Sequence, residues 1–221
     1  MKNIFLMTVG FLLLTGTAVA SNCPNLYPEN SELAVTGTTE LCNSFYVVRF
    51  DEVKNIPMFS AELLQPNKAG ITRSNDFHPD DRLNKSVRAE NSDYAGTGYD
   101  KGHMTPAEDA STPEEMHDTF LLSNMTPQCP TLNRQPWRML EEAVHKKVNT
   151  LNTPTHIITG AIYGTHSGTI GKHNILIPLA YYKIIYLDSG IEAYYALNSN
   201  DAKVQQVSLE SLQKLVPFVI K

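Results

Sequence analysis

The chain has 221 residues, of which 42% are hydrophobic and 19% are charged. This apolar content suits one well-packed domain and is too small for two comfortable ones, so we expect a single globular domain. Lys2 is the only charged residue among the first twenty, so the remainder carries 17 Lys and Arg against 23 Asp and Glu, a net charge of −6 with histidine neutral. This balance excludes a broadly basic nucleic-acid-binding surface; a polyanion would need a local basic groove, helped by a bound cation.

The first twenty residues have the features of a cleavable secretory signal peptide. Lys2 precedes an apolar stretch at 4–14, and small residues end at Ala20. We expect cleavage near Ala20, which leaves residues 21–221 as one secreted domain, periplasmic or extracellular, without membrane attachment. An uncleaved anchor is disfavoured because glycines interrupt an apolar run shorter than the roughly 20 residues that span a bilayer. Cys23 lies too far past the cut for a lipid anchor.

Three cysteines follow, and export would place them in an oxidising compartment. One disulfide is then expected and one thiol is left over. We favour Cys23 with Cys42, which would tie the N-terminal arm to the first strand. The sequence itself permits all three pairings, and Cys129 could instead be a buried small side chain or an intermolecular partner.

The N-terminal half of the mature chain predicts two strands and a long irregular region. Residues 44–50 and 58–64 are rich in aromatic and β-branched side chains and are separated by a polar turn. Residues 65–99 are polar, punctuated by Gly, Asn and Pro, and lack a sustained period. Such regions in compact domains are often functional.

The C-terminal half predicts helices followed by strands. Thr112 with Pro113 and Glu115 has the pattern of a capped helix running toward Leu121, and apolar residues recur at helical spacing over 137–151. Strands are expected at 156–163, 174–187 and 191–197, and a final helix at 202–215. The order predicts an α+β fold with a mainly antiparallel central sheet flanked by helices.

Chemistry-bearing residues concentrate in three runs of the sequence. They are Tyr-Asp-Lys-Gly-His-Met-Thr-Pro-Ala at 99–107, Leu-Ser-Asn-Met-Thr-Pro-Gln at 122–128, and Leu-Asn-Arg-Gln-Pro-Trp-Arg-Met-Leu-Glu at 132–141. With them the chain resembles the DNA/RNA non-specific endonucleases of the ββα-metal superfamily, whose signatures are Asp-Arg-Gly-His, Leu-Ser-Asn ending Pro-Gln, and Leu-Asn-x-x-x-Trp-x-x-Leu-Glu. The likeness covers nearly the whole mature chain and implies a ββα-metal nuclease fold.

Phosphodiester hydrolysis requires a base to deprotonate water, cations on the phosphate, and stabilisation of the leaving oxygen. An unperturbed imidazole titrates near pH 6.5, and the resemblance makes His103 the general base. A lone histidine would more often be an ordinary surface or core residue. Gly102 before it would permit an unusual backbone angle or a close approach of the substrate.

The resemblance also implies a hydrated divalent metal with Asn133 as its direct protein ligand. An amide oxygen with several waters suits Mg²⁺, and Mn²⁺ could substitute. Asn133 could instead, or also, cap the helix that follows. Glu141 lies about 12 Å further along a helix, so we assign it to hydrogen-bonding a metal-bound water; the alternative is a surface pair with His145.

The resemblance assigns phosphate binding to Arg73 and Lys101. Lys101 departs from the arginine that is usual in the family and offers a point charge without the bidentate fork, which would alter rate and substrate preference. Asn124 and Gln128 resemble positions that arrange substrate or backbone around the site; structural turn roles are the alternative. Each cation could also be an ordinary solvated surface charge.

Other hydrolase classes lack their signatures in this sequence. We find no His-Glu-x-x-His, no paired Cys-x-x-Cys and no Gly-x-Ser-x-Gly. The resemblance implies cleavage of single- and double-stranded DNA and RNA that leaves 5′-phosphate ends, by an enzyme that reads backbone. The alternative is an inactive nuclease fold that binds nucleic acid or a partner protein. A toxin would also need an inhibitor protein; the sequence does not specify an oligomeric state.

Overall fold

The computed structural model describes residues 21–28, 33, 35, 37–66, 71–216, 218 and 220. The expected signal peptide at 1–20 lies outside the described residues. Among those described, no helix is both long enough and apolar enough to cross a membrane.

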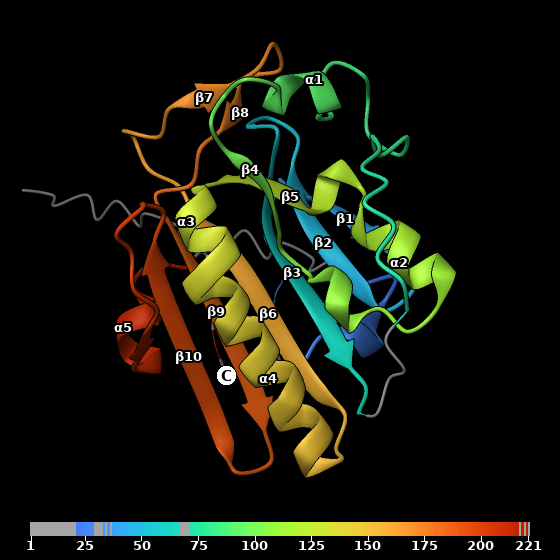
Figure 1. Ribbon diagram of the computed structural model, residues 1–221, viewed down its shortest axis with the longest axis vertical. Helices are drawn as coiled ribbons and strands as arrows, with labels where there is room; N and C mark the ends of the chain where they lie inside the picture. The colour runs from blue at the N-terminus through green and yellow to red at the C-terminus, as the bar shows by residue number, and fades with distance from the viewer. Residues whose placement is uncertain are drawn as a thin grey trace, which may run out of the picture.

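A seven-stranded sheet forms the centre of the molecule, with every neighbouring pair antiparallel (Figure 1). In spatial order its strands are β1 (Thr39–Cys42), β2 (Tyr46–Asp51), β3 (Ile56–Leu64), β6 (Thr155–Ile162), β9 (Ala180–Leu187), β10 (Gly190–Leu197) and β11 (Gln205–Val207). The predicted α+β class and antiparallel sheet are confirmed.

Within the described residues, two small sheets and five α-helices complete the fold. β4 (Asp100–His103) pairs with β5 (Met125–Gln128), and β7 (Thr169–Ile170) pairs with β8 (Ile175–Leu176). The α-helices are α1 (Asn91–Tyr94), α2 (Pro113–Thr119), α3 (Pro130–Leu132), α4 (Arg138–Leu151) and α5 (Leu209–Gln213). A π-helical turn, Asn133–Trp137, joins α3 to α4, and 3-10 turns lie at Pro24–Leu26, Ala107–Asp109 and Leu122–Asn124.

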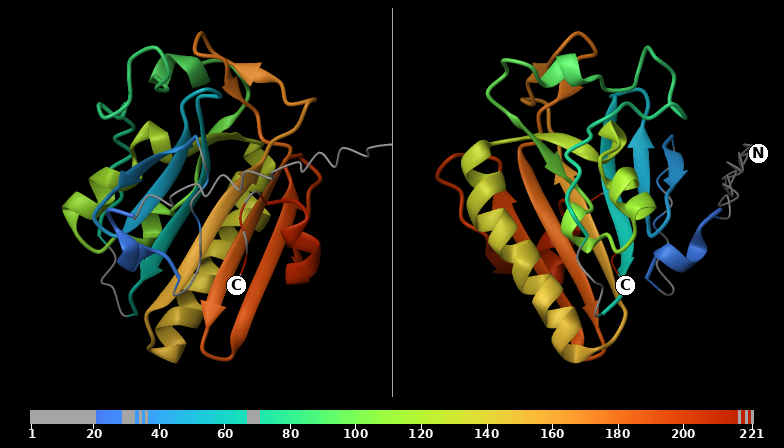
Figure 2. Two further views of the ribbon diagram at one scale, coloured as in Figure 1. Left: turned by 180° about the vertical axis from the view of Figure 1, so that it is seen from behind. Right: turned by 45° about the vertical axis from the view of Figure 1, so that its right-hand side comes forward.

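Alternation along the central strands lets the sheet bury both faces. In β9, Tyr181 and Ile185 pack in the core beneath α4, whereas Tyr182 and Ile184 pack with residues of the N-terminal arm and α5. Figures 1 and 2 show α4 and α2 on one face and α5 on the other. The sheet is therefore the middle layer, and β4 and β5 lie on the α4 side.

Most of the predicted elements are confirmed. β2, β3, β6, β10, α2 and α4 appear within a few residues of their predicted bounds. The predicted cap of α2 is present, because the Thr112 hydroxyl accepts a hydrogen bond from the Glu115 amide at 3.1 Å. A short helix, α1, interrupts the irregular region.

Two C-terminal predictions are wrong. The single strand expected over 174–187 is divided into β8 and β9, with Pro178 in the break, since proline has no amide hydrogen for a ladder. The helix expected over 202–215 is shortened to α5. Residues of β11 instead pair with β10, and Ser208 caps the helix that begins after them. Pairing to an open sheet edge outweighs the weak helical pattern.

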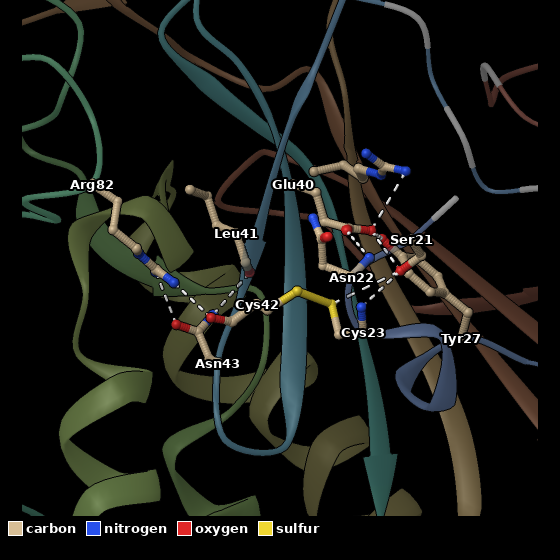
Figure 3. The surroundings of a disulfide bond; sticks show 10 residues. Ser21, Asn22, Cys23, Tyr27, Glu40, Leu41, Cys42, Asn43 and Arg82 are labelled. Carbon is tan, nitrogen blue, oxygen red and sulfur yellow. Dashed lines mark hydrogen bonds and ion pairs between the residues drawn. A yellow bond between two sulfur atoms is a disulfide. The ribbon is translucent and has the colours of Figure 1, made fainter. Parts of the chain in front are cut away.

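A disulfide between Cys23 and Cys42 ties the N-terminal arm to β1, as favoured from the sequence (Figure 3). Glu40 gathers the same arm: its carboxylate accepts hydrogen bonds from the Ser21 hydroxyl (2.8 Å), the Asn22 amide (2.7 Å) and the Tyr27 hydroxyl (2.9 Å). The disulfide and the hydrogen bonds to Glu40 therefore hold the N-terminal arm against the sheet.

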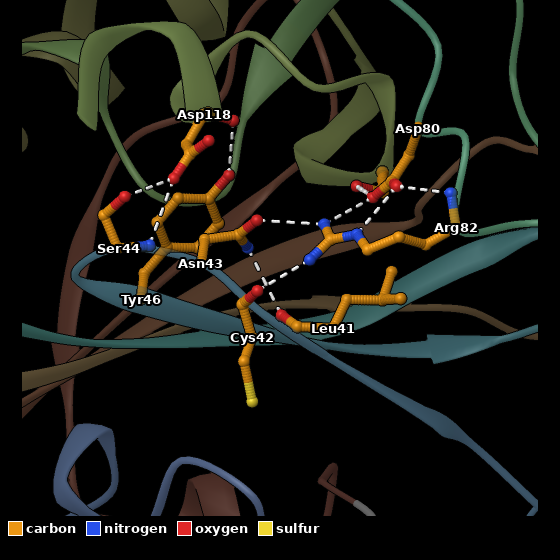
Figure 4. Close-up of polar contacts among 9 residues, drawn as sticks. Leu41, Cys42, Asn43, Ser44, Tyr46, Asp80, Arg82 and Asp118 are labelled. Carbon is orange, nitrogen blue, oxygen red and sulfur yellow. Dashed lines mark hydrogen bonds and ion pairs between the residues drawn. The ribbon is translucent and has the colours of Figure 1, made fainter. Parts of the chain in front are cut away.

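A polar network fixes α2 and the irregular region against the first hairpin (Figure 4). The Asp118 carboxylate accepts hydrogen bonds from the Ser44 amide and hydroxyl at 3.1 and 2.6 Å. The Arg82 guanidinium donates to the Cys42 carbonyl at 2.6 Å and forms an ion pair with buried Asp80. Segments distant in sequence are thereby held at defined positions beside the sheet.

Replacing Cys23 and Cys42 with serine should lower the free energy of unfolding by about 3 kcal/mol, because the cross-link closes a loop across 19 positions in the unfolded chain. Urea unfolding of both proteins measures this. Dithiothreitol should destabilise the wild type and leave the double variant unchanged; equal stabilities would contradict the expected contribution of the disulfide.

Candidate active site

The β4–β5 pair displays the histidine motif on one face of a short ribbon. Lys101 and His103 alternate with Gly102 along β4 and so point to the same side. A Cβ built on Gly102 would lie only 2.3 Å from Oε1 of Gln128. The glycine therefore permits close approach of a neighbouring side chain, one of the two roles expected for it.

Two aromatic rings enclose the imidazole of half-buried His103. The ring of Phe120 meets it edge-on at 5.1 Å, and the ring of Phe77 lies at 5.8 Å. Its Nε2 is buried without a hydrogen-bond partner among the described residues. Burial, with the positive charge of Arg73, lowers the pKa of His103 to about 3. The imidazole is therefore neutral at pH 7, the form that can accept a proton.

The two predicted phosphate-binding cations lie beside these same rings. The guanidinium carbon of Arg73 is 5.0 Å from the Phe120 ring centre, and Nζ of Lys101 is 4.7 Å from that of Phe77. Burial lowers the pKa of both cations. Neither forms an ion pair with a carboxylate in the described part of the chain, so both charges are available to an anion.

A hollow of about 540 Å³ brings the cations together with the predicted metal ligand. Its lining consists of Arg73, Asn75, Phe77, Asn91, Tyr94, Ala95, Tyr99, Asp100, Lys101, Asn133 and Arg134. His103 is not part of the lining but contacts Phe77, which is. The irregular region, β4 and the π-helical turn thus form one concave site.

Asn133 lies one turn inside a helical segment, which corrects the expected position at the helix start. The helical run begins at Pro130, and Asn133 opens the π-helical turn that contains Pro136. The proline lacks the amide hydrogen of a regular helix, and π-helical turns are frequent at functional sites. Asn133 is therefore not the N-cap of the helix that follows it, because Trp137 holds that position.

Asp100 orients the Asn133 side chain. Nδ2 of Asn133 donates to Oδ2 of Asp100 at 2.9 Å, and Arg134 forms an ion pair with the other carboxylate oxygen at 2.6 Å. With the amide nitrogen engaged, the amide oxygen is the atom left for a ligand. The sequence interpretation did not assign Asp100, although it belongs to the histidine run.

Glu141 presents a buried acceptor whose charge acts on Arg73. Its Oε1 has no hydrogen-bond partner among the described residues. Burial raises the pKa of Glu141 to about 7, opposed by Lys183 and reinforced by Asp109. The expected alternative, a pair with His145, does not engage this atom, and Nδ1 of His145 lies 2.9 Å from Asp109.

These groups fit a hydrated divalent cation. Asn133 offers an amide oxygen at the hollow. Glu141 is not part of the lining, and its unpartnered Oε1 would accept a hydrogen bond from a water of the ion's hydration shell. Oxygen donors of this kind suit Mg²⁺ better than a soft metal.

Asn124 lies outside the lining of the hollow, which favours the structural one of its two expected roles. It is fully buried, and its amide bonds the main chain of Thr105 at 3.0 and 2.9 Å and the Thr119 carbonyl at 3.0 Å. It therefore holds the backbone that follows β4. Gln128 is also fully buried and packs on Gly102, which is a scaffold position as well.

Sequence reasoning missed the aromatic enclosure of His103 and the buried Lys183. Lys183 donates to the Thr159 hydroxyl at 2.5 Å and its Nζ lies 6.0 Å from the Trp137 ring centre. The burial of Lys183 could have been predicted, because it is the one charged residue in a strand of apolar and aromatic residues. Nothing comparable marks Phe77 or Phe120 as neighbours of the histidine.

The chain is similar to known nucleases. A family model described as DNA/RNA non-specific endonuclease matches residues 28–218. Mitochondrial endonuclease G of Bos taurus is 29% identical over 176 residues, covering 73% of this chain and 58% of that protein. A nuclease of Nostoc sp. is 31% identical over 196 residues, covering 78% of this chain and 69% of that protein.

A solved structure shares the fold. A chain in the crystal structure of the EndoG/EndoGI complex, which concerns the mechanism of EndoG inhibition, aligns with a TM-score of 0.74 at 27% identity. The alignment covers 82% of this chain and 84% of that one. The expected ββα-metal nuclease fold is confirmed. The chain nevertheless spans only 58% and 53% of bovine and human endonuclease G.

The low pKa of His103 predicts a pH-dependent loss of stability. The histidine takes up a proton near pH 6.5 when unfolded but near pH 3 when folded, so its contribution is complete above pH 6.5 and is lost as the pH falls toward 3. In EDTA, the free energy of unfolding of the wild type should fall more steeply between pH 6.5 and 4 than that of His103→Asn. The difference in slope should stay below about 1.4 kcal/mol per pH unit, since one proton is involved. Parallel urea-unfolding curves across this range would contradict the assigned environment.

Proposed function

Because the chain belongs to the DNA/RNA non-specific endonuclease family, we propose that it is a metal-dependent hydrolase that cuts phosphodiester bonds inside DNA and RNA chains. One observation carries the proposal. The lining of the hollow contains Arg73 and Lys101, neither of which is paired with a carboxylate among the described residues, and Asn133, whose amide is oriented by Asp100. The neutral imidazole of His103 lies behind Phe77 of this lining. This is the set of groups that phosphodiester hydrolysis requires.

His103 is the general base in this proposal. Its unpartnered Nε2 accepts the proton of the attacking water, and the neutral state at pH 7 keeps the lone pair free. Phe77 and Phe120 limit the access of other solvent to the ring. Arg73 and Lys101 bind the phosphate oxygens and offset the charge that develops on them.

Asn133 would hold the divalent cation directly, and Glu141 would hold its hydration shell. When bound, the cation supplies Lewis-acid stabilisation of the leaving oxygen. Asp100 keeps the Asn133 amide oriented, so its role is positioning. We propose Mg²⁺ as the ion, with Mn²⁺ as a substitute.

The lining favours recognition of backbone over bases. Arg73, Lys101 and Arg134 supply positive charge, and the aromatic rings in the lining tolerate any base. We therefore propose single- and double-stranded DNA and RNA as substrates, with 5′-phosphate products. An inhibitor protein is a further proposed partner, supported by the likeness to a chain solved in an EndoG/EndoGI complex.

We also propose that residues 21–221 are a single nuclease domain exported after removal of residues 1–20. The disulfide between Cys23 and Cys42 supports an oxidising compartment such as the periplasm or the cell exterior. Relatives include mitochondrial proteins as well as that of Nostoc sp., so detection of the mature chain outside the cytoplasm is the direct test.

The proposed activity predicts metal-dependent loss of plasmid DNA and total RNA on gels, abolished by EDTA. His103→Ala should slow both reactions by at least about 100-fold, the contribution typical of a general base. The control is His166→Ala, an exposed histidine outside the hollow lining. Absence of cleavage with any divalent metal would favour the inactive binding protein, and activity retained in His103→Ala would show that another group is the base.

Lys101 should contribute one phosphate contact. Lys101→Ala is expected to lower kcat/KM on both nucleic acids by about 10-fold or more and to reduce the salt-dependence slope of substrate binding by about one. Lys101→Arg should retain most of the activity. Lys146→Ala, an exposed change on α4, is the charge-matched control. An unchanged salt slope in Lys101→Ala would place this lysine outside the substrate contacts.

A further inference from the structure

A second group of metal-ligating side chains lies beside the candidate active site. Asp76, His78 and His117 each place one ligand atom within 4.8 Å of the other two. The first two residues belong to the irregular region and the third to α2. None of them lines the hollow that contains Asn133.

His78 has the hydrogen bonding of a metal-binding imidazole. Its Nδ1 lies 2.7 Å from the carbonyl oxygen of Asp76, so Nδ1 carries the proton and donates it. The lone pair is then on Nε2, which is buried and has no hydrogen-bond partner among the described residues. A ligating histidine characteristically donates its other ring hydrogen to a carbonyl or carboxylate in this way.

His117 and Asp76 can complete the coordination. The ring of His117 stacks on that of His78 with centroids 4.1 Å apart and an interplanar angle of 30°. Ligands of a tetrahedral zinc ion lie about 3.3 Å from one another, given metal–ligand bonds of about 2.0–2.1 Å. In the stacked arrangement the lone pairs of the two rings run nearly parallel, so binding requires the exposed His117 side chain to leave the stack. Asp76 is also exposed, and both side chains are free to turn toward Nε2 of His78.

The backbone already holds the two ligand-bearing segments together. The His78 amide donates to the Phe120 carbonyl at 3.2 Å, and the Leu122 amide donates to the His78 carbonyl at 2.8 Å. The polar network of Figure 4 fixes the flanking residues, since Asp118 follows His117 and Asp80 lies two residues after His78. The backbone of both segments therefore needs little ordering when an ion binds, and the change is confined to the side chains of His117 and Asp76.

We propose that Asp76, His78 and His117 bind one divalent transition-metal ion, Zn²⁺ being the best match, at a site separate from that of Asn133. Two imidazoles and one carboxylate suit zinc and disfavour Mg²⁺, which requires oxygen ligands. In the sequence Phe77 lies between Asp76 and His78, and Phe120 directly follows α2; the rings of both phenylalanines contact His103. A bound ion would therefore fix the two aromatic rings that enclose the histidine.

The test is zinc binding by the mature chain in magnesium-free buffer, measured by equilibrium dialysis. The wild type and the exposed-histidine control His166→Ala should bind one high-affinity zinc ion. His117→Ala and Asp76→Asn should weaken this binding by at least about 100-fold. Asn133→Ala should retain it, which distinguishes this site from that of the proposed nuclease reaction. Unchanged affinity in His117→Ala and Asp76→Asn, or loss in Asn133→Ala, would overturn the proposal.

Three further comparisons distinguish loss of the metal ligands from misfolding of the variant. Without metal, His117→Ala should match the wild type in circular dichroism and Tm, because its side chain is exposed. Zinc at about 100 times its Kd should raise the Tm of the wild type by roughly 5 °C and leave that of His117→Ala unchanged. Zinc should also slow amide exchange at 71–79 in the wild type alone. Equal zinc effects on both proteins would contradict the site.

Discussion

The pairing of β4 with β5 is the constraint on which the candidate site depends. Two strands of four residues are too short to be stable alone, so the ribbon persists because Asn124 and its neighbours hold it. The Met104 amide donates to the Asn124 carbonyl at 2.9 Å, while the Asn124 side chain bonds the next residue, Thr105. A buried, fully bonded amide thereby sets the orientation of His103 and Lys101, although it never meets solvent.

Local charge arrangement makes an acidic chain compatible with the polyanionic substrate proposed for it. The hollow collects Arg73, Lys101 and Arg134, whereas the carboxylates facing it are few, and Asp100 is already engaged by Arg134 and Asn133. Asp100 is the one carboxylate in the described lining, so the net negative charge of the chain arises outside the hollow. Positive charge concentrated in one depression favours the approach of an anion there.

The parts of the fold that follow from sequence are those governed by local pattern. A high content of aromatic and β-branched residues located β2, β3 and β6, and the Thr112 cap located α2. β4 and β5 escaped prediction because they are short and carry polar residues, and their pairing joins segments more than twenty residues apart. The family motifs singled out His103 and Asn133. The burial of Asn124 and Gln128, which favours scaffold roles for both, cannot be read from a motif.

The π-helical turn changes the angular positions of the residues around the helix axis. Leu132 and Trp137 are five residues apart, which in an α-helix would place them about 140° from each other around the axis. A turn closed between residues i and i+5 stacks them instead, and both are buried in the same core cluster. Asn133, the next residue after Leu132, is thereby rotated out of the core toward the hollow. Because the π-helical turn contains one residue more than an α-helical turn, the same helical segment packs Leu132 and Trp137 against the sheet and directs the Asn133 amide toward the hollow.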